Sequence, residues 1–147
     1  MTIDPQSAII YAAYGSNLDL KAMAKRCPDA KRLSKGILKD YKLVFGAKGF
    51  LDVVPSQGDR VQVGVYSVSM TDLAALDEYE EYPELYDRIP LMIHTEDLGD
   101  VEALVYVMQP YTDQKYPSET YWKTIKQGFE DYGFDVSDLE RARDSVM

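Results

Sequence analysis

A run of carboxylates between Asp77 and Glu84, DEYEEYPE, is the segment best suited to proton transfer. Tyrosines interleave with these acids, and a carboxylate held among rings loses hydration, which raises its pKa toward the range useful for acid–base catalysis. Charge runs are usually solvated surfaces, so catalysis requires that at least one acid turn inward. If Leu76 faces the core, helical spacing places Tyr79 and Glu80 on the same face, whereas Glu78 and Glu81 point outward.

A second candidate is the segment YGSNL, from Tyr14 to Leu18, which lies between an apolar run and a predicted helix. Gly15 permits close backbone approach, and free N–H groups in a turn or at a helix start can hold a carboxylate or an oxyanion. The same residues are also compatible with an ordinary strand-to-helix turn capped by Ser16 or Asn17. Neither a phosphate-loop pattern nor a dinucleotide pattern of three glycines is present, so we expect no nucleotide cofactor.

The Cys and His content excludes several other kinds of site. The chain has one of each, Cys27 and His94, which rules out an internal disulfide and a zinc site of Cys and His ligands. We expect Cys27 to pack at a helix end and His94 to be a hydrogen-bonded surface residue. A metal site made only of the acidic run's carboxylates is a further alternative, disfavoured because adjacent acids at one helix end splay outward. We therefore expect no metal.

Length and charge indicate a single domain that avoids polyanions. The 147 residues are 46% hydrophobic and contain no linker, so we expect one domain over residues 1–147. The formal net charge of −9 repels phosphate backbones and anionic lipid heads, which argues against nucleic-acid and membrane partners. No apolar run approaches the ~20 residues needed to span a bilayer, and residues 1–7 do not resemble a signal peptide, so we expect a cytoplasmic protein.

Hydrophobic periodicity and capping residues predict about six strands and four helices. Apolar, β-branched and aromatic runs predict the strands, at residues 9–14, 37–45, 51–55, 61–69, 86–94 and 101–108. The last two strands are expected to form a hairpin. Cap and stop residues predict the helices, at residues 19–27 with Asn17 or Asp19 as the cap, from Ser69 or Thr71 to near Pro83, from Ser118 to Gly133, and at 138–146 after a capping box of Ser137 and Glu140.

The order of these elements indicates an α+β fold. The strands are grouped rather than alternating strictly with helices, which argues against a doubly wound parallel sheet. We expect a curled sheet, mostly antiparallel or mixed, with the helices around it.

Several motifs, in the same order along the chain, resemble one family. The segment YAAYGSNL, Tyr11 to Leu18, resembles the signature Y-x-A-Y-G-S-N-L of the gamma-glutamylcyclotransferase-like (AIG2-like) proteins. Met23 to Pro28 is similar to the signature's continuation, and Leu76 to Arg88 is similar to the family's acidic segment. The resemblance covers Ile9 to Phe129 and includes two further strand segments, at residues 38–45 and 58–66.

The resemblance implies a fold and a set of site residues. The fold would be a small mixed, mostly antiparallel barrel-like sheet with flanking helices, with a pocket between the YGSNL loop and the acidic segment. Glu80 matches the family's general acid/base. The residues that match those binding the γ-glutamyl group or lining the pocket are Tyr14, Gly15, Ser16, Asn17, Leu18, Tyr86 and Tyr121. Two residues depart from the family pattern: Glu81 stands where glycine is common, and Asp52 where a small residue is frequent.

The activity implied by the resemblance is metal-independent cyclisation of a small γ-glutamyl amide, a transferase or lyase reaction without a cofactor. The substrate's own α-amine attacks the γ-carbonyl carbon, releasing 5-oxoproline and a free amine or amino acid, with Glu80 transferring the proton. Two alternatives remain open on sequence alone. One is a gamma-glutamylamine cyclotransferase acting on isopeptide or metabolite amides, and the other is a non-catalytic module that binds a small ligand on the same scaffold. The sequence does not specify an oligomeric state.

Overall fold

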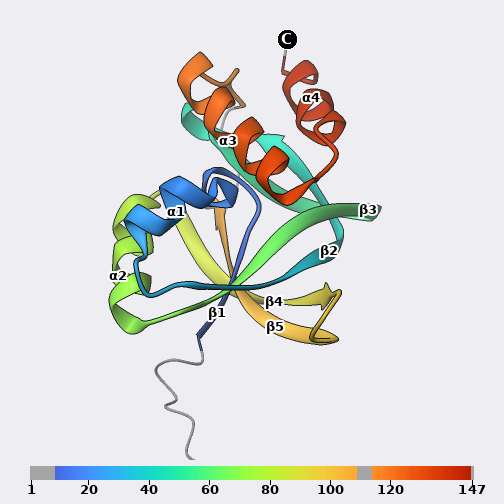
Figure 1. Ribbon diagram of the computed structural model, residues 1–147. Coiled ribbons are helices and arrows are strands. Elements are labelled where there is room, and N and C mark those ends of the chain that lie inside the picture. Colours follow the sequence, from blue (N-terminus) through green and yellow to red (C-terminus); the bar gives the residue numbers. More distant parts are fainter. Residues whose placement is uncertain (1–8, 109–113, 147) are drawn as a thin grey trace, which may run out of the picture.

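Five strands close into a barrel in the order β1-β3-β2-β4-β5 in the computed structural model, which describes residues 9–108 and 114–146 (Figure 1). The strands are β1 (Ile9–Ala13), β2 (Lys31–Phe45), β3 (Leu51–Val68), β4 (Tyr86–Thr95) and β5 (Asp100–Met108). All neighbouring pairs are antiparallel except β1 and β5, which close the barrel in parallel. The predicted α+β class with a mixed, mostly antiparallel barrel-like sheet is confirmed.

The β2–β3 pair corrects the predicted strand count. The runs 51–55 and 61–69 were expected to be two strands, but they form the single strand β3, which pairs with β2 along most of its length. The chain passes the polar stretch between them because Gly58 adopts a left-handed conformation, with φ of 87°, and its N–H donates to the Asp40 side chain of β2 at 2.9 Å. A register shift between Lys39 and Tyr41 keeps the two strands paired on both sides of this point.

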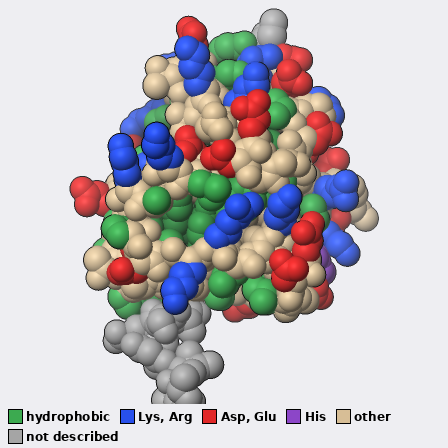
Figure 2. All heavy atoms as spheres, viewed as in Figure 1, with side chains coloured by type: hydrophobic (Ala, Val, Ile, Leu, Met, Phe, Trp, Pro, Cys, Tyr) green, Lys and Arg blue, Asp and Glu red, His purple; other side chains and the backbone are tan. Residues whose placement is uncertain are grey.

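The four α-helices of the described residues lie in two pairs. Helices α1 (Leu20–Arg26) and α2 (Met70–Tyr79) lie on one side of the barrel, and α3 (Glu119–Tyr132) and α4 (Ser137–Asp144) lie at one end (Figure 1). None of these helices has the length and apolar character needed to cross a membrane. On the face shown in Figure 2, basic and acidic side chains are interspersed around an apolar hollow over the middle of the barrel.

The caps of the first three helices follow the sequence predictions. The Asp19 side chain accepts from Lys21 and Ala22 N–H groups at the start of α1, and the Ser118 side chain accepts from Tyr121 N–H at the start of α3. Ser69 forms a capping box with Asp72 at the start of α2. Gly133 follows α3 in the left-handed conformation, with φ of 70°.

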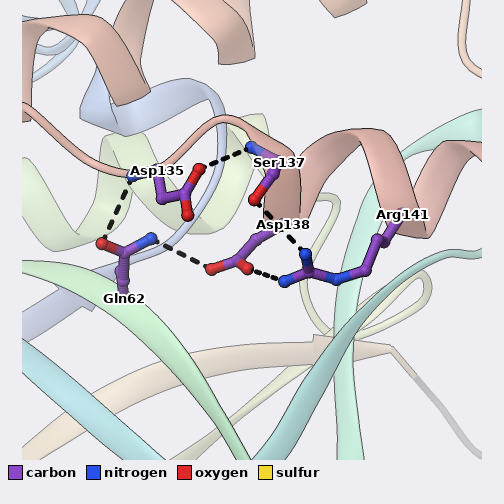
Figure 3. Close-up of polar contacts among 5 residues, drawn as sticks. All are labelled: Gln62, Asp135, Ser137, Asp138 and Arg141. Atoms are coloured by element: carbon purple, nitrogen blue, oxygen red, sulfur yellow. Dashed lines mark hydrogen bonds and ion pairs between the residues drawn. The ribbon is translucent and has the colours of Figure 1, made fainter.

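The capping box predicted for α4 is wrong. The helix begins at Ser137 itself. The residue before it, Val136, has no polar side-chain group that could cap the helix. Instead, the Asp135 carboxylate accepts from the Ser137 N–H at 3.0 Å, while the Ser137 hydroxyl accepts from Arg141 (Figure 3). Gln62 of β3 holds this end of the helix by donating to the Asp138 carboxylate at 3.0 Å. Asp135 and Arg141 are local partners that the capping-box pattern did not take into account, and only Gln62 comes from another element.

Helix α3 fixes the loop that leaves β1. This loop is the 3-10 turn η2 (Ser16–Leu18), and it lies directly against Gly128 of α3. A Cβ atom at Gly128 would lie 2.6 Å from the Asp19 backbone nitrogen and 2.7 Å from the Leu18 carbonyl carbon. The Asp131 carboxylate of the same helix also accepts from the Leu20 N–H at 3.1 Å. The position of the loop therefore depends on the absence of a side chain at residue 128.

We expect Gly128→Ala to displace this loop and to lower the free energy of unfolding by about 1–3 kcal/mol, because the added methyl group would overlap backbone atoms that cannot rotate away. Urea denaturation measures the effect. Lys126→Ala, an exposed position on the same helix, is the matched control. Equal stability of the two variants would contradict the close approach described here.

Candidate active site

Glu80 lies where α2 ends and the chain turns toward β4. Its N–H donates to the Leu76 carbonyl at 2.9 Å, which completes the last turn of the helix. The side chain is partly buried and lines a cavity of about 30 Å³ together with residues of the loop after β1. Glu78 and Glu81 are exposed, and so is Tyr79, which was wrongly predicted to share the inward face of Leu76. Of the acids at and just after the end of α2, the structure therefore turns Glu80 toward the interior.

Burial raises the pKa of Glu80 from its usual 4.5 to about 7. The positive charge of Arg26 acts in the opposite direction and keeps the pKa from rising further. Among the described residues, no group donates a hydrogen bond to this carboxylate, so its ionised form has lost water without gaining a partner. A carboxyl group with a pKa near neutrality is suited both to accept and to donate a proton.

The end of α2 is anchored by a partly buried ion pair next to Glu80. Arg88 of β4 binds Asp77 through two hydrogen bonds, from Nε at 2.9 Å and from an Nη at 3.1 Å. The Tyr106 hydroxyl donates to the same carboxylate at 2.7 Å. Leu76, which precedes Asp77, is fully buried. These contacts fix the rotation of the helix end and therefore the direction in which Glu80 points.

The loop after β1 forms the opposite wall of the cavity and is held through Asn17. The Asn17 side chain donates to the Tyr11 hydroxyl at 2.8 Å and accepts from Arg26. The backbone carbonyl of Asn17 accepts from the Tyr66 hydroxyl at 3.1 Å. The Ser16 hydroxyl lies 2.8 Å from that of Tyr79. The loop is thus tied to two strands and two helices.

The backbone of this loop retains donors for a ligand. No described residue accepts a hydrogen bond from the N–H of Ser16 or Asn17. The Leu18 N–H, in contrast, donates to the Gly15 carbonyl at 3.0 Å, and the Leu18 side chain is fully buried in the core. Leu18 does not line the cavity, which limits the predicted binding segment to Tyr14–Asn17.

Three tyrosines of the cavity wall meet at one backbone unit, Leu51 at the start of β3. The Tyr86 hydroxyl donates to the Leu51 carbonyl at 2.5 Å, and the Leu51 N–H donates to the Tyr121 hydroxyl at 3.1 Å. The Tyr14 hydroxyl lies 3.5 Å from the same carbonyl and donates to the Tyr106 carbonyl at 2.7 Å. Burial raises the pKa of all three phenols, so they remain protonated at neutral pH.

Glu80 also lines a second cavity, of about 100 Å³, whose outer walls are Phe50, Tyr79, Glu81 and Leu85. The two cavities share the remaining walls, which are Ser16, Glu80, Tyr86 and Tyr121. Glu80 therefore stands where a polar recess and a more apolar recess meet.

Asp52 does not line either cavity. Its buried carboxylate accepts from the N–H groups of Val53 at 2.8 Å and Met108 at 3.0 Å. Burial raises the pKa of Asp52, although these two hydrogen bonds lower it. Asp52, which departs from the family pattern, thus ties β3 to the end of β5 and does not change the pocket wall.

The other reactive residues of the sequence lie apart from Glu80. His94 is in the β4–β5 hairpin, where its Nδ1 lies 2.7 Å from the Asp100 carboxylate. Burial raises the pKa of the Cys27 thiol to about 12, so it is not a nucleophile at neutral pH. Within residues 9–108 and 114–146, no group of three or more Asp, Glu, His or Cys side chains is arranged to bind a metal ion.

Sequence reasoning missed several residues that support the site. Arg26 is part of the matched motif, but its contacts with Asn17 and with the Tyr79 ring, 3.4 Å from the guanidinium carbon to the ring centre, were not expected. Leu51, Tyr11 and Tyr106 were also missed. Their contribution comes from backbone groups or from hydroxyls that cross the barrel, which no spacing along the chain records.

Comparisons with known proteins give consistent matches. Residues 11–124 match a protein-family model described as gamma-glutamyl cyclotransferase, AIG2-like. The human gamma-glutamylcyclotransferase is 28% identical, over 94% of this chain and 79% of the human protein, and that of Bos taurus is 29% identical over 86% and 72%. A solved structure of a gamma-glutamyl cyclotransferase, 26% identical, gives a TM-score of 0.82 over 95% of this chain and 88% of that chain. The family match includes every residue predicted for the site.

The raised pKa of Glu80 makes stability depend on pH. The unfolded chain ionises this carboxyl near pH 4.5, whereas the folded chain does so only near pH 7, so the fold loses stability as pH rises through this interval. Glu80→Gln removes the ionisation. Each pKa unit corresponds to about 1.4 kcal/mol, so the variant should be more stable than wild type by up to about 3 kcal/mol at pH 8. The difference should vanish near pH 4.

Urea denaturation at pH 4, 6 and 8 tests this expectation. Glu78→Gln, at an exposed position two residues earlier, is the control and should show no comparable trend. If Glu80→Gln and wild type differed by a constant amount at all three pH values, the carboxyl would not be desolvated in the fold.

Proposed function

The chain belongs to the gamma-glutamyl cyclotransferase, AIG2-like family, and we propose that it converts a small γ-glutamyl amide to 5-oxoproline and a free amine or amino acid. The observation that carries this proposal is the placement of Glu80. It is partly buried, has a pKa of about 7, and shares a cavity with the loop whose Ser16 and Asn17 N–H groups have no acceptor among the described residues.

The reaction requires only positioning and proton transfer. The α-nitrogen of the glutamyl group forms a bond to its own γ-carbonyl carbon, closing a five-membered ring, and the bond from that carbon to the leaving nitrogen breaks. The Glu80 carboxylate takes the proton released by the α-nitrogen and returns it to the leaving nitrogen, which departs as a neutral amine. The carboxylate is regenerated, and neither an oxidant nor a second substrate is consumed.

The loop after β1 supplies the complementary half of the site. Its free N–H groups can hold a negatively charged oxygen of the substrate, either the α-carboxylate or the oxyanion that develops on the γ-carbonyl. One such donor contributes roughly 3–4 kcal/mol to transition-state stabilisation. The contacts that hold Asn17 keep the loop in place, so little reorganisation accompanies the reaction.

A γ-glutamyl group is larger than the cavity of about 30 Å³ on the loop side of Glu80, which has room for little more than water. Binding therefore requires the site to open toward the second cavity. The hydrogen bond between the Ser16 and Tyr79 hydroxyls is the contact that we expect to break, since Ser16 lines both cavities and Tyr79 lines only the second.

A small-ligand binding module on the same scaffold is the second candidate. It would need the loop donors and the tyrosines but would have no use for a carboxyl group with a pKa near neutrality. The cost of holding Glu80 away from water favours turnover over simple binding.

Glu80→Gln should lower the rate of 5-oxoproline release from a γ-glutamyl substrate by about 10²–10⁴-fold, because the amide can neither accept nor return the proton. Glu78→Gln, which alters an exposed acid on the same helix, should retain the wild-type rate. Release of 5-oxoproline by Glu80→Gln at the wild-type rate would remove Glu80 from the mechanism. Binding of γ-glutamyl compounds without product from the wild-type protein would favour the binding module.

The pH profile tests the same group in the wild-type protein. Activity should rise with pH through a midpoint near 7, because Glu80 acts as a base only when ionised. Arg26→Met removes the charge that lowers this pKa, so the midpoint should move to higher pH. Lys25→Met, an exposed neighbour, should leave the midpoint unchanged. A midpoint unaffected by Arg26→Met would show that another group controls the profile.

A further inference from the structure

The second cavity lies on the side of Glu80 where the leaving group must go. The glutamyl group is expected on the side of the loop donors, and Glu80 has to deliver its proton to the leaving nitrogen. The remainder of the leaving group then projects away from the loop, into the recess that shares Ser16, Glu80, Tyr86 and Tyr121 with the first cavity. Its volume of about 100 Å³ accommodates several non-hydrogen atoms.

Two of the outer-wall residues of this recess, Phe50 and Leu85, are apolar. Phe50 packs against Tyr121 with ring centres 5.1 Å apart, and both rings line the recess. Leu85 is partly buried and lies in the turn between α2 and β4. Hydrocarbon placed between Phe50 and Leu85 would be removed from water on both sides, which favours an apolar leaving group.

The charges at the recess are acidic. Glu80 and Glu81 line it, and no Lys, Arg or His side chain does so among the described residues. Two cations contact residues of its wall without lining it: Lys48 pairs with the Glu81 carboxylate at 3.2 Å, and Arg26 binds Asn17 and the Tyr79 ring. A second carboxylate in the leaving group would meet like charges at close range.

We propose that Phe50, Leu85 and Glu81 form a leaving-group subsite that favours short apolar side chains and rejects acidic ones, with Glu81 as the residue that sets the charge preference. This inference rests on the proposed cyclotransferase function. It assigns a role to Glu81, the residue that replaces the family's common glycine.

Four substrates in two matched pairs test the subsite, with 5-oxoproline release as the readout. γ-Glutamyl-asparagine and γ-glutamyl-aspartate differ in charge at nearly equal size, and the wild-type protein should prefer the asparagine compound by about tenfold in kcat/KM. γ-Glutamyl-leucine and γ-glutamyl-alanine differ in apolar size, and the leucine compound should be preferred by about tenfold. Phe50→Ala should reduce the second preference without changing the first.

Two substitutions of opposite effect isolate the charge. Glu81→Gln should reduce the asparagine preference several-fold, whereas Lys48→Met, which leaves the Glu81 carboxylate unpaired, should increase it. Glu84→Gln, an exposed acid outside both cavities, is the control and should change neither preference.

The outcomes separate the subsite from the function on which it rests. Release of 5-oxoproline from all four compounds at equal efficiency, or movement of the asparagine preference in the same direction by Glu81→Gln and Lys48→Met, would overturn the subsite and leave the cyclotransferase function intact. Absence of release from every compound would overturn the proposed function, and the subsite with it.

Discussion

The site depends on keeping one carboxyl group, that of Glu80, partly out of water. Water stabilises an ionised carboxylate, so the fold has to hold the group in place against that tendency. The Leu76 carbonyl, the Asp77–Arg88 ion pair and the buried Leu76 side chain supply this restraint at the end of α2. A looser helix end would let Glu80 rotate into solvent, and its pKa would return to the ordinary range. The members of the acidic run are therefore unequal: Glu80 is held partly out of water, Asp77 anchors the helix end through Arg88, and Glu78 and Glu81 are exposed.

The barrel contributes a rigid polar frame around that group. The backbone of Leu51, the first residue of β3, forms hydrogen bonds with three tyrosines. Its carbonyl accepts from Tyr86 of β4 and Tyr14 of the segment after β1, and its N–H donates to Tyr121 of α3. Backbone groups in a closed sheet cannot move independently, so these phenols are held relative to each other without direct bonds between them. The same frame explains why Asp52 is tolerated next to the site. Its carboxylate accepts from two backbone N–H groups, one in β3 and one at the end of β5, and it lines neither cavity.

What could be predicted from the sequence is the part of the fold that local chemistry determines. Asp19, Ser69, Ser118 and Gly133 act at helix ends through bonds to residues within a few positions, and each was identified. The inward direction of Glu80 follows from helical spacing relative to Leu76. The continuous strand β3 could not be predicted, because its polar middle is stabilised by the Asp40 side chain of a different strand. The capping box of α4 is absent for a different reason, because the Ser137 hydroxyl accepts from Arg141 of the same helix and the Ser137 N–H donates to Asp135.

Arg26 shows why the two halves of the site cannot be adjusted separately. Its guanidinium group holds Asn17, and thus the loop donors, while its charge lowers the pKa of Glu80. A stronger base at residue 80 would follow from removing this charge, but the loop would lose one of its anchors at the same time. Retaining Arg26 fixes the loop and also limits the rise of the Glu80 pKa to about 7. The pKa of Glu80 and the geometry of the loop therefore both depend in part on the same side chain, so a substitution of Arg26 changes both.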